Sequence, residues 1–103
     1  MSDNVINVNS DCNLSEVVNI TTSQIINRGR CELRDVVICA STADDVIDVY
    51  DGHNTNGKLI LRLYVKSGYN YTVNMSRPVN LHYGLYVNVP KTTSYVTVCY
   101  MMI

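Results

Sequence analysis

The chain has 103 residues, of which 47% are hydrophobic and 17% charged, and its formal net charge is −1 at pH 7. This length suits one domain with one core and leaves no room for a second. The eight basic residues are scattered along the chain and are matched by nine acids, which argues against nucleic-acid and anionic-membrane partners.

Residues 1–7 lack the basic and apolar regions of a secretory signal, and no later run approaches about 18 apolar residues. We therefore expect synthesis in a host cytoplasm, where thiols are kept reduced. The four cysteines, Cys12, Cys31, Cys39 and Cys99, include no C-x-x-C pair and have no histidine close in sequence. We expect packed thiols, with a disulfide and a metal site as the alternatives.

The first sixteen residues differ from the rest of the chain. Asparagine and serine dominate residues 1–16, and the apolar residues Val5, Ile6 and Val8 stand isolated among them. Such a segment makes few contacts of its own. We expect an extended N-terminal arm that is either disordered or lies on a neighbouring subunit, with these three apolar side chains as its contacts.

Residues 17–103 have the composition of a β domain. Val, Ile, Thr and Tyr dominate, and no segment repeats apolar residues at i, i+3, i+4 and i+7 over three turns. Turn signals recur every 8 to 15 residues or so, a rhythm of about the spacing found in all-β sandwiches and barrels. The expected strands are residues 17–26, 31–40, 46–50, 58–66, 69–75, 85–89 and 94–101.

Alternation along these strands predicts which side chains face the core. Residues 36–40 are apolar on both faces, so either parity fits a core there, as in a central strand. Elsewhere the inward residues are expected to be Leu59, Leu61, Leu63, Val65, Tyr71, Val73, Met75, Leu85, Val87, Val89, Val96, Val98 and Tyr100.

The chain has eight tyrosines but neither Phe nor Trp. Tyr64, Tyr86 and Tyr95 fall on the parity opposite the core, where they are large for a solvated sheet. Tyrosine combines apolar area with one polar group, which suits a partly wet interface. We predict that these three tyrosines anchor an interface. The alternative is that they lie across the rim of the domain with their hydroxyls in water.

Two segments of the sequence resemble a known family. Val49–Leu59, V-Y-D-G-H-N-T-N-G-K-L, is similar to the V-Y-D-G-T-x-x-x-G-K-x-L hairpin of small β-sandwich proteins from tailed bacteriophage particles. Arg77–Val87 resembles the P-x-x-F-x-x-G-L-Y-V stretch that follows in those proteins, although Leu81 replaces the usual aromatic residue. With the closing strand, the resemblance covers about two thirds of the chain, from Val36 to Met101.

The resemblance implies a single antiparallel β-sandwich, jelly-roll-like, of about seven or eight strands. It also implies a protein that assembles, often as trimers, on the exterior of a capsid as a decoration or cement protein, or at the head of a fibre.

One cluster of acidic residues is a candidate metal site. Asp44, Asp45, Asp48 and Asp51 offer hard oxygen ligands for Ca²⁺, but they do not follow the EF-hand spacing. Asp48 alternates with apolar neighbours, as on a solvated strand face. We expect turn and surface roles for these acids, and no metal or cofactor.

The two histidines are candidate catalytic groups. His53 lies two residues after Asp51, which invites a hydrolase interpretation, but no G-x-S-x-G elbow or similar nucleophile accompanies the pair. Two isolated histidines, His53 and His82, also argue against a metal-dependent enzyme on a jelly-roll scaffold. We expect no catalytic residue.

The leading hypothesis is a non-enzymatic structural protein of a virus particle. It forms a homotrimer, binds the major capsid protein or another virion protein on the capsid exterior, and binds neither nucleic acid nor membrane. The alternative is a fibre or spike head module that binds a host receptor or glycan through the exposed loops Asp51–Asn56 and Lys66–Asn70.

Overall fold

The computed structural model describes residues 16–91 and 94–103, and in these ranges every regular element is a β-strand. The expected all-β class is therefore confirmed. Seven predicted strands become eight: β1 (Glu16–Ile20), β2 (Gln24–Asn27), β3 (Cys31–Ala40), β4 (Asp45–Asp51), β5 (Lys58–Val65), β6 (Asn70–Leu81), β7 (Leu85–Asn88) and β8 (Ser94–Met102).

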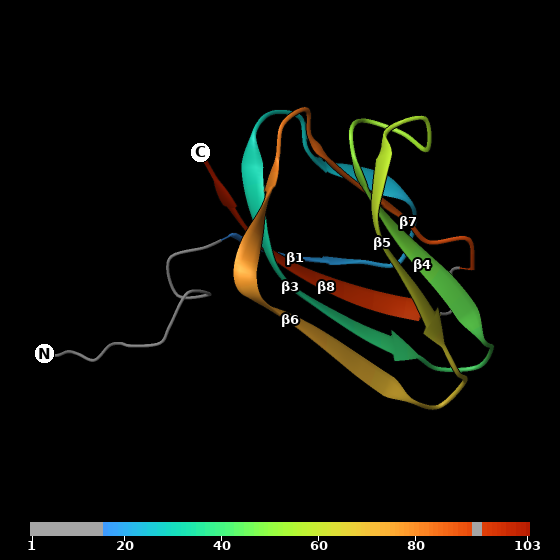
Figure 1. The fold of residues 1–103 in the computed structure, drawn as a ribbon. Helices are drawn as coiled ribbons and strands as arrows, with labels where there is room; N and C mark the ends of the chain where they lie inside the picture. Colours follow the sequence, from blue (N-terminus) through green and yellow to red (C-terminus); the bar gives the residue numbers. More distant parts are fainter. Residues whose placement is uncertain (1–15, 92–93) are drawn as a thin grey trace, which may run out of the picture.

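The strands form two four-stranded antiparallel sheets that pack face to face (Figure 1). Sheet A has the order β1-β8-β3-β6, and sheet B has the order β2-β7-β4-β5. The first strand pairs with the last, the second with the seventh, the third with the sixth, and the fourth with the fifth. This nested pairing is a long hairpin wrapped around a core, which is the jelly-roll arrangement of eight strands. The expected antiparallel sandwich is confirmed.

The prediction of one strand over residues 17–26 is wrong, because the chain changes sheets within it. β1 belongs to sheet A and β2 to sheet B, and the polar residues Thr21–Ser23 connect them. Ser23 fixes this crossing: its Oγ donates to Asn88 Oδ1 at 3.1 Å and accepts from Val89 N at 2.7 Å. A polar crossing whose serine bonds to the end of β7 explains why the strand is interrupted.

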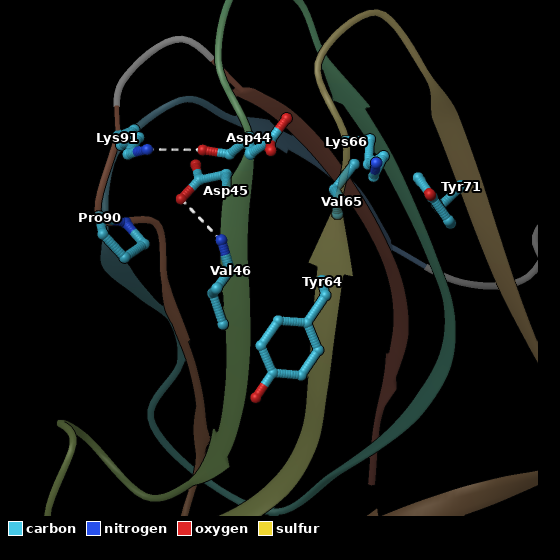
Figure 2. A pocket seen from close by; sticks show the side chains of 9 residues that line it. All are labelled: Asp44, Asp45, Val46, Tyr64, Val65, Lys66, Tyr71, Pro90 and Lys91. Carbon is cyan, nitrogen blue, oxygen red and sulfur yellow. Dashed lines mark hydrogen bonds between the residues drawn. The ribbon is translucent and has the colours of Figure 1, made fainter.

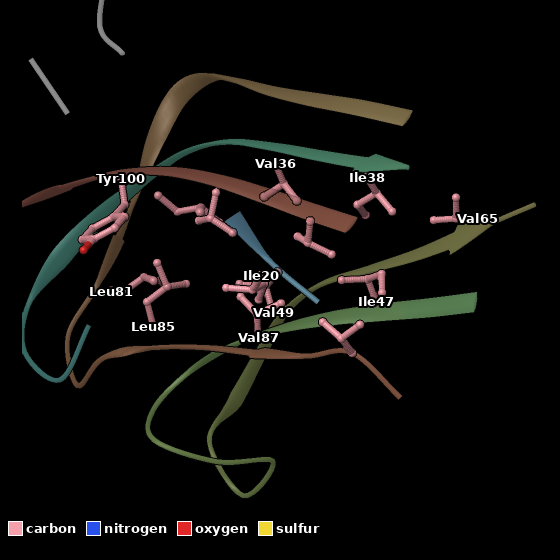
Figure 3. Close-up of a cluster of buried hydrophobic side chains, with 14 of the residues drawn as sticks. Ile20, Val36, Ile38, Ile47, Val49, Val65, Leu81, Leu85, Val87 and Tyr100 are labelled. Carbon is pink, nitrogen blue, oxygen red and sulfur yellow. The ribbon is translucent and has the colours of Figure 1, made fainter. Parts of the chain in front are cut away.

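The core lies between the two sheets and is built from aliphatic side chains (Figure 3). On β3, Val36, Ile38 and Ala40 are fully buried whereas Val37 is 37% exposed, which settles the parity that the sequence left open. Val36 and Ile38 face Ile47 of the opposite sheet across the interior. Burying such side chains stabilises the fold by about 1.5–3 kcal/mol each.

The face assignment of β5 is confirmed for most of its length and wrong at its start. Leu61, Leu63 and Val65 contact the core, but Leu59 is 42% exposed. Val49 of β4 pairs with Leu61 and the next residue, Tyr50, pairs with Leu59, so Ile60 is an extra residue in β5. An extra residue of this kind, a β-bulge, reverses the facing of all residues beyond it.

The strand β6 is longer than predicted, running twelve residues from Asn70 to Leu81. Tyr71, Val73 and Met75 contact the core as expected. Between the pairs Asp35–Asn74 and Leu33–Val79 the register shifts by several residues. Bulges let a strand bend without leaving the sheet, and this one carries β6 on to the turn that precedes β7.

The cysteines differ among themselves. Cys31 and Cys39 are free thiols, as expected, and burial raises the pKa of Cys31, although a hydrogen bond from Asn27 acts in the opposite direction. Cys99 is disulfide-bonded, so the expectation of thiols is wrong for this residue.

Candidate interaction surface

The outward face of sheet B carries a row of large apolar side chains across all four strands. Ile25 pairs with Tyr86, Tyr86 with Tyr50, and Tyr50 with Leu59. The rings of Tyr50 and Tyr86 lie 6.2 Å apart between centroids and are tilted by 52°, a separation at which aromatic pairs attract. Because strand neighbours of these residues point into the core, this row lies on the outer side of the sheet, where Leu59 is 42% exposed, Ile25 and Tyr86 are half-buried and Tyr50 is 9% exposed.

The next row on the same face contains an ion pair between a buried carboxylate and a partly exposed guanidinium. Asp48 pairs with Asn88 on one side and with Arg62 on the other. The Arg62 guanidinium donates to both carboxylate oxygens of Asp48, at 2.8 and 3.0 Å, and the Tyr50 hydroxyl lies 3.3 Å away. These hydrogen bonds and the charge of Asp48 raise the pKa of Arg62. The positive charge of Arg62 therefore balances the negative charge of Asp48, and this row carries no net charge.

Asp48 departs from its predicted role. It was expected on a solvated strand face, and it does lie on an outward face, yet it is only 6% exposed. Arg62 and Tyr50 cover it. The face thus presents aromatic rings and a neutralised pair instead of a free carboxylate.

The third row, Val46 and Tyr64, leads into a hollow at the end of the sandwich. Tyr64 is 71% exposed. Figure 2 shows its ring beside Val46, with Lys66 and Tyr71 on the neighbouring wall. The hollow has a volume of about 550 Å³, and Val65 and Pro90 add apolar surface to it. It is continuous with the outward face of sheet B through Val46 and Tyr64.

The acids beside this hollow have structural partners. Both oxygens of Asp45 accept hydrogen bonds, from Val46 N at 2.8 Å and from Ser94 Oγ at 2.9 Å. Asp44 accepts from Ser67 N through its side chain and from Lys91 Nζ through its carbonyl (Figure 2). These contacts tie together the loops that frame the hollow.

The outward face of sheet A has a different character. Val17, Val37 and Tyr95 lie on it and are 52%, 37% and 59% exposed, but they stand in different rows. Polar side chains bond across the strands around them: Thr97 Oγ1 donates to Asn19 Oδ1 at 2.6 Å, and Asn74 Nδ2 donates to Asp35 Oδ1 at 2.8 Å. Ladders of this kind are typical of a sheet face in water. Of the two outward faces, only that of sheet B carries a continuous aromatic and aliphatic row.

The structure separates the tyrosines that the sequence grouped together. Tyr64 and Tyr86 share the outward face of sheet B. Tyr95 pairs with Cys39 in sheet A and lies on the opposite side of the molecule, where it is 59% exposed. The predicted arm contacts, Val5, Ile6 and Val8, lie outside the described residues.

Sequence reasoning missed Tyr50, Leu59 and Ile25 as members of the sheet B face. Tyr50 lies in the recognised hairpin segment, and its position opposite Tyr86 depends on the pairing of β4 with β7. Leu59 reaches the face only because of the bulge at Ile60. Strand pairing and bulges leave no periodic signal in the sequence that would have located these residues.

The acidic residues considered as calcium ligands do not lie together in the fold. Asp44 and Asp45 lie beside the hollow, whereas Asp51 contacts the turn after β6. Within residues 16–91 and 94–103, no three side chains of His, Cys, Asp or Glu gather closely enough to hold a metal ion. Nor do those ranges contain a helix with the length and hydrophobicity that a membrane span requires.

The fold and this surface define a jelly-roll sandwich in which the outward face of sheet B carries a continuous row of aromatic and aliphatic residues. Comparison with family models, with curated proteins and with solved structures finds no match for the chain.

Proposed function

We propose that this chain is a non-enzymatic structural protein of a virus particle, a decoration protein that forms a homotrimer and binds the capsid shell. The observation that carries the proposal is the outward face of sheet B, where Tyr64 and Leu59 are 71% and 42% exposed beside Tyr50 and Tyr86. Apolar patches of this kind, bordered by polar residues, mark interaction sites on soluble domains.

The edges of the two sheets favour contact through a face. The outer strand β5 carries Lys58 and Arg62, and the outer strand β6 is interrupted by its register shift and by Pro78. The other outer strands, β1 and β2, have only five and four residues. Charged, bulged and short edges all discourage pairing with a strand of another chain.

The size of the face suits a protein that acts in many copies. Four strands spaced about 4.8 Å apart, each about five residues long at ~3.4 Å per residue, outline roughly 330 Å². Stable interfaces bury about 800 Å² on each partner. One such face alone therefore gives a weak contact, and a repeated array on a shell adds such contacts by multivalency.

The trimer and the binding to a shell are inferred in this proposal from the family resemblance. The two segments that carry the resemblance lie side by side in the fold. Asp51 of the first segment pairs with Leu85 of the second, and the Asp51 carboxylate accepts from the backbone of His82 and Tyr83. The jelly roll also occurs in many viral capsid proteins, which is an argument from fold analogy alone.

The test is binding to shells of the parent virus assembled without this chain. The purified protein is mixed with the shells and the mixture is sedimented. We expect the protein to move with the shells at a fixed ratio of copies, and to lose this property in the Leu59→Lys variant, because a charge on the apolar row would break the trimer and with it the multivalent contact to the shell. Protein that stays in the supernatant at every concentration contradicts the proposal.

The alternative function, a fibre or spike head that binds a host receptor or glycan, places binding in the end loops instead of the sheet face. Of the two loops named for it, Asp51–Asn56 lines a second hollow, whereas Lys66 borders the hollow beside Tyr64. The hollow lined by the Asp51–Asn56 loop favours this alternative, because an exposed aromatic ring and several amide side chains border it.

A further inference from the structure

A hollow of about 740 Å³ lies between the β4–β5 loop and the end of β6 with the turn that follows it. It is separate from the outward row of sheet B. The β4–β5 loop and the turn after β6 line it, and His53 Nε2 joins both to the carbonyl oxygen of Arg28. Loops at one end of a rigid sandwich are a common location for ligand sites.

Asp51 fixes the turn on one side of this hollow. Its carboxylate accepts from the backbone N–H of His82 at 3.0 Å and of Tyr83 at 2.8 Å. Burial raises the pKa of Asp51, but these bonds, a third from Gly84 N–H and the charge of His82 together bring it below its ordinary value. The carboxylate is therefore ionised at neutral pH, and its oxygens face the backbone of the turn that borders the hollow.

His53 and Gly84 complete the frame. His53 Nε2 lies 2.9 Å from the carbonyl oxygen of Arg28 and 2.8 Å from that of Tyr83, so this nitrogen carries the proton and donates to both. At Gly84 a Cβ atom would lie 2.8 Å from the carbonyl oxygen of Asn27. The loops are packed and hydrogen-bonded to one another, and little ordering is left for a ligand to impose.

The backbone of Tyr83 is held by hydrogen bonds, whereas its ring is exposed. Asp51 holds its N–H and His53 holds its carbonyl, each at 2.8 Å, yet its side chain is 72% exposed. Its ring lies edge-on to the ring of His82, with centroids 6.5 Å apart. An exposed ring at the mouth of a hollow is suited to stacking against a flat apolar surface of a ligand, because a tyrosine side chain has few torsions to order on binding.

The other exposed groups are hydrogen-bonding groups. Asn56 and Asn80 line the hollow, and their side-chain amides make no hydrogen bond within the described part of the chain. Lys58 and the His82 ring are exposed beside them. The arrangement offers amide donors and acceptors, an imidazole and an ammonium next to one aromatic ring.

We propose that this hollow binds a carbohydrate. The Tyr83 ring stacks on the apolar face of a pyranose, and Asn56 and Asn80 bond to its hydroxyls. Lys58 favours a sugar that carries a carboxylate, because Asp51, the one acid lining the hollow, is taken up by backbone donors. The proposal concerns a different surface from the sheet B face, so each can fail without the other.

The test is titration of the ¹⁵N-labelled protein with the methyl glycosides of glucose, galactose, N-acetylglucosamine and glucuronic acid, followed by NMR. The glycosides are added to well above about 1 mM, so that weak binding is also detected. We expect saturable shift changes confined to the amides of residues 52–58 and 80–84, with glucuronate binding most tightly.

Two variants make the test specific. Tyr83→Ala keeps the backbone bonds to Asp51 and His53 and removes only the ring, so it should weaken binding at least about tenfold, or about 1.4 kcal/mol. Tyr69→Ala removes another exposed ring, 62% exposed in the wild type, in the β5–β6 turn, and should bind like the wild type. Absence of saturable shifts with all four glycosides, or equal binding by the Tyr83→Ala variant, overturns the proposal.

Discussion

The guanidinium of Arg62 covers the carboxylate of Asp48 on the outward face of sheet B, with Nε 2.8 Å from Oδ1 and Nη2 3.0 Å from Oδ2. The Asp48 side chain is 8% exposed and that of Arg62 is 45% exposed. A nearly buried anion therefore depends on one cation that water reaches. The aromatic face can be apolar overall because this pair leaves no unbalanced charge on it.

Replacement of Arg62 by Ala should destabilise the fold, because among the described residues it leaves Asp48 with only the Tyr50 hydroxyl near its carboxylate. We expect a lower midpoint of thermal unfolding for Arg62→Ala and partial recovery for the double variant Arg62→Ala/Asp48→Asn, in which the buried charge is gone. Far-ultraviolet circular dichroism follows the transition. Equal midpoints for the single and double variants would show that the charge is well solvated.

Replacement of Gly84 by Ala should cost about 1–3 kcal/mol of unfolding free energy, because its Cβ would meet backbone oxygens. Those of Asn27 and Gly52 lie 2.8 and 2.9 Å from its position. Gly29→Ala is the matched control, since nothing lies within 4 Å of a Cβ there. Urea unfolding measures both variants, and equal stability of the two would mean that the three loops are not tightly packed.

Stability should fall in acid partly through Asp51. The pKa of Asp51 is lower in the folded protein than its ordinary value, so its contribution is full above the ordinary aspartate value of about 3.9 and is lost as the pH falls through the folded value. Asp51→Asn should lose about 2 kcal/mol at pH 7, since one oxygen acceptor and the charge are removed. Its stability should also change less than that of the wild type between pH 5 and pH 2, about the range over which aspartate titrates. Parallel pH profiles for the two proteins would contradict this role.

Leu33 of β3 and Leu59 of β5 have opposite environments. Leu33 is fully buried and Leu59 is 42% exposed. Leu33→Ala should therefore cost about 2–5 kcal/mol, and Leu59→Ala should cost less than about 1 kcal/mol. Chemical denaturation checks both values. A large loss for Leu59→Ala would place this side chain in the core and remove it from the outward face.

Much of the fold could be predicted from sequence because a half-buried sheet imposes alternation. Leu85 and Val87, together with Val96 and Val98, lie on the predicted inward parity of their strands and are all fully buried. The crossing at Ser23 could not be predicted, because the hydrogen bonds that stop β1 come from Asn88 and Val89, more than sixty residues away.

The candidate surface could be predicted only in part. The exposure of Tyr64 follows from strand parity, and the structure agrees. Parity does not say which sheet a strand joins, so it could not separate Tyr86 from Tyr95, which lie on opposite outward faces. The frame around Tyr83 was also hidden, because Asp51 and His53 reach it across about thirty residues of sequence.

The central claim is that the outward face of sheet B joins copies of this chain. Sedimentation equilibrium of the wild type, Tyr64→Lys and Tyr95→Lys tests it most directly, because the two tyrosines are exposed on opposite faces. We predict a concentration-dependent trimer for the wild type and Tyr95→Lys, and a monomer for Tyr64→Lys with an unchanged unfolding midpoint. A wild-type chain that stays monomeric at the highest concentrations, or a Tyr64→Lys variant that assembles like the wild type, contradicts the claim.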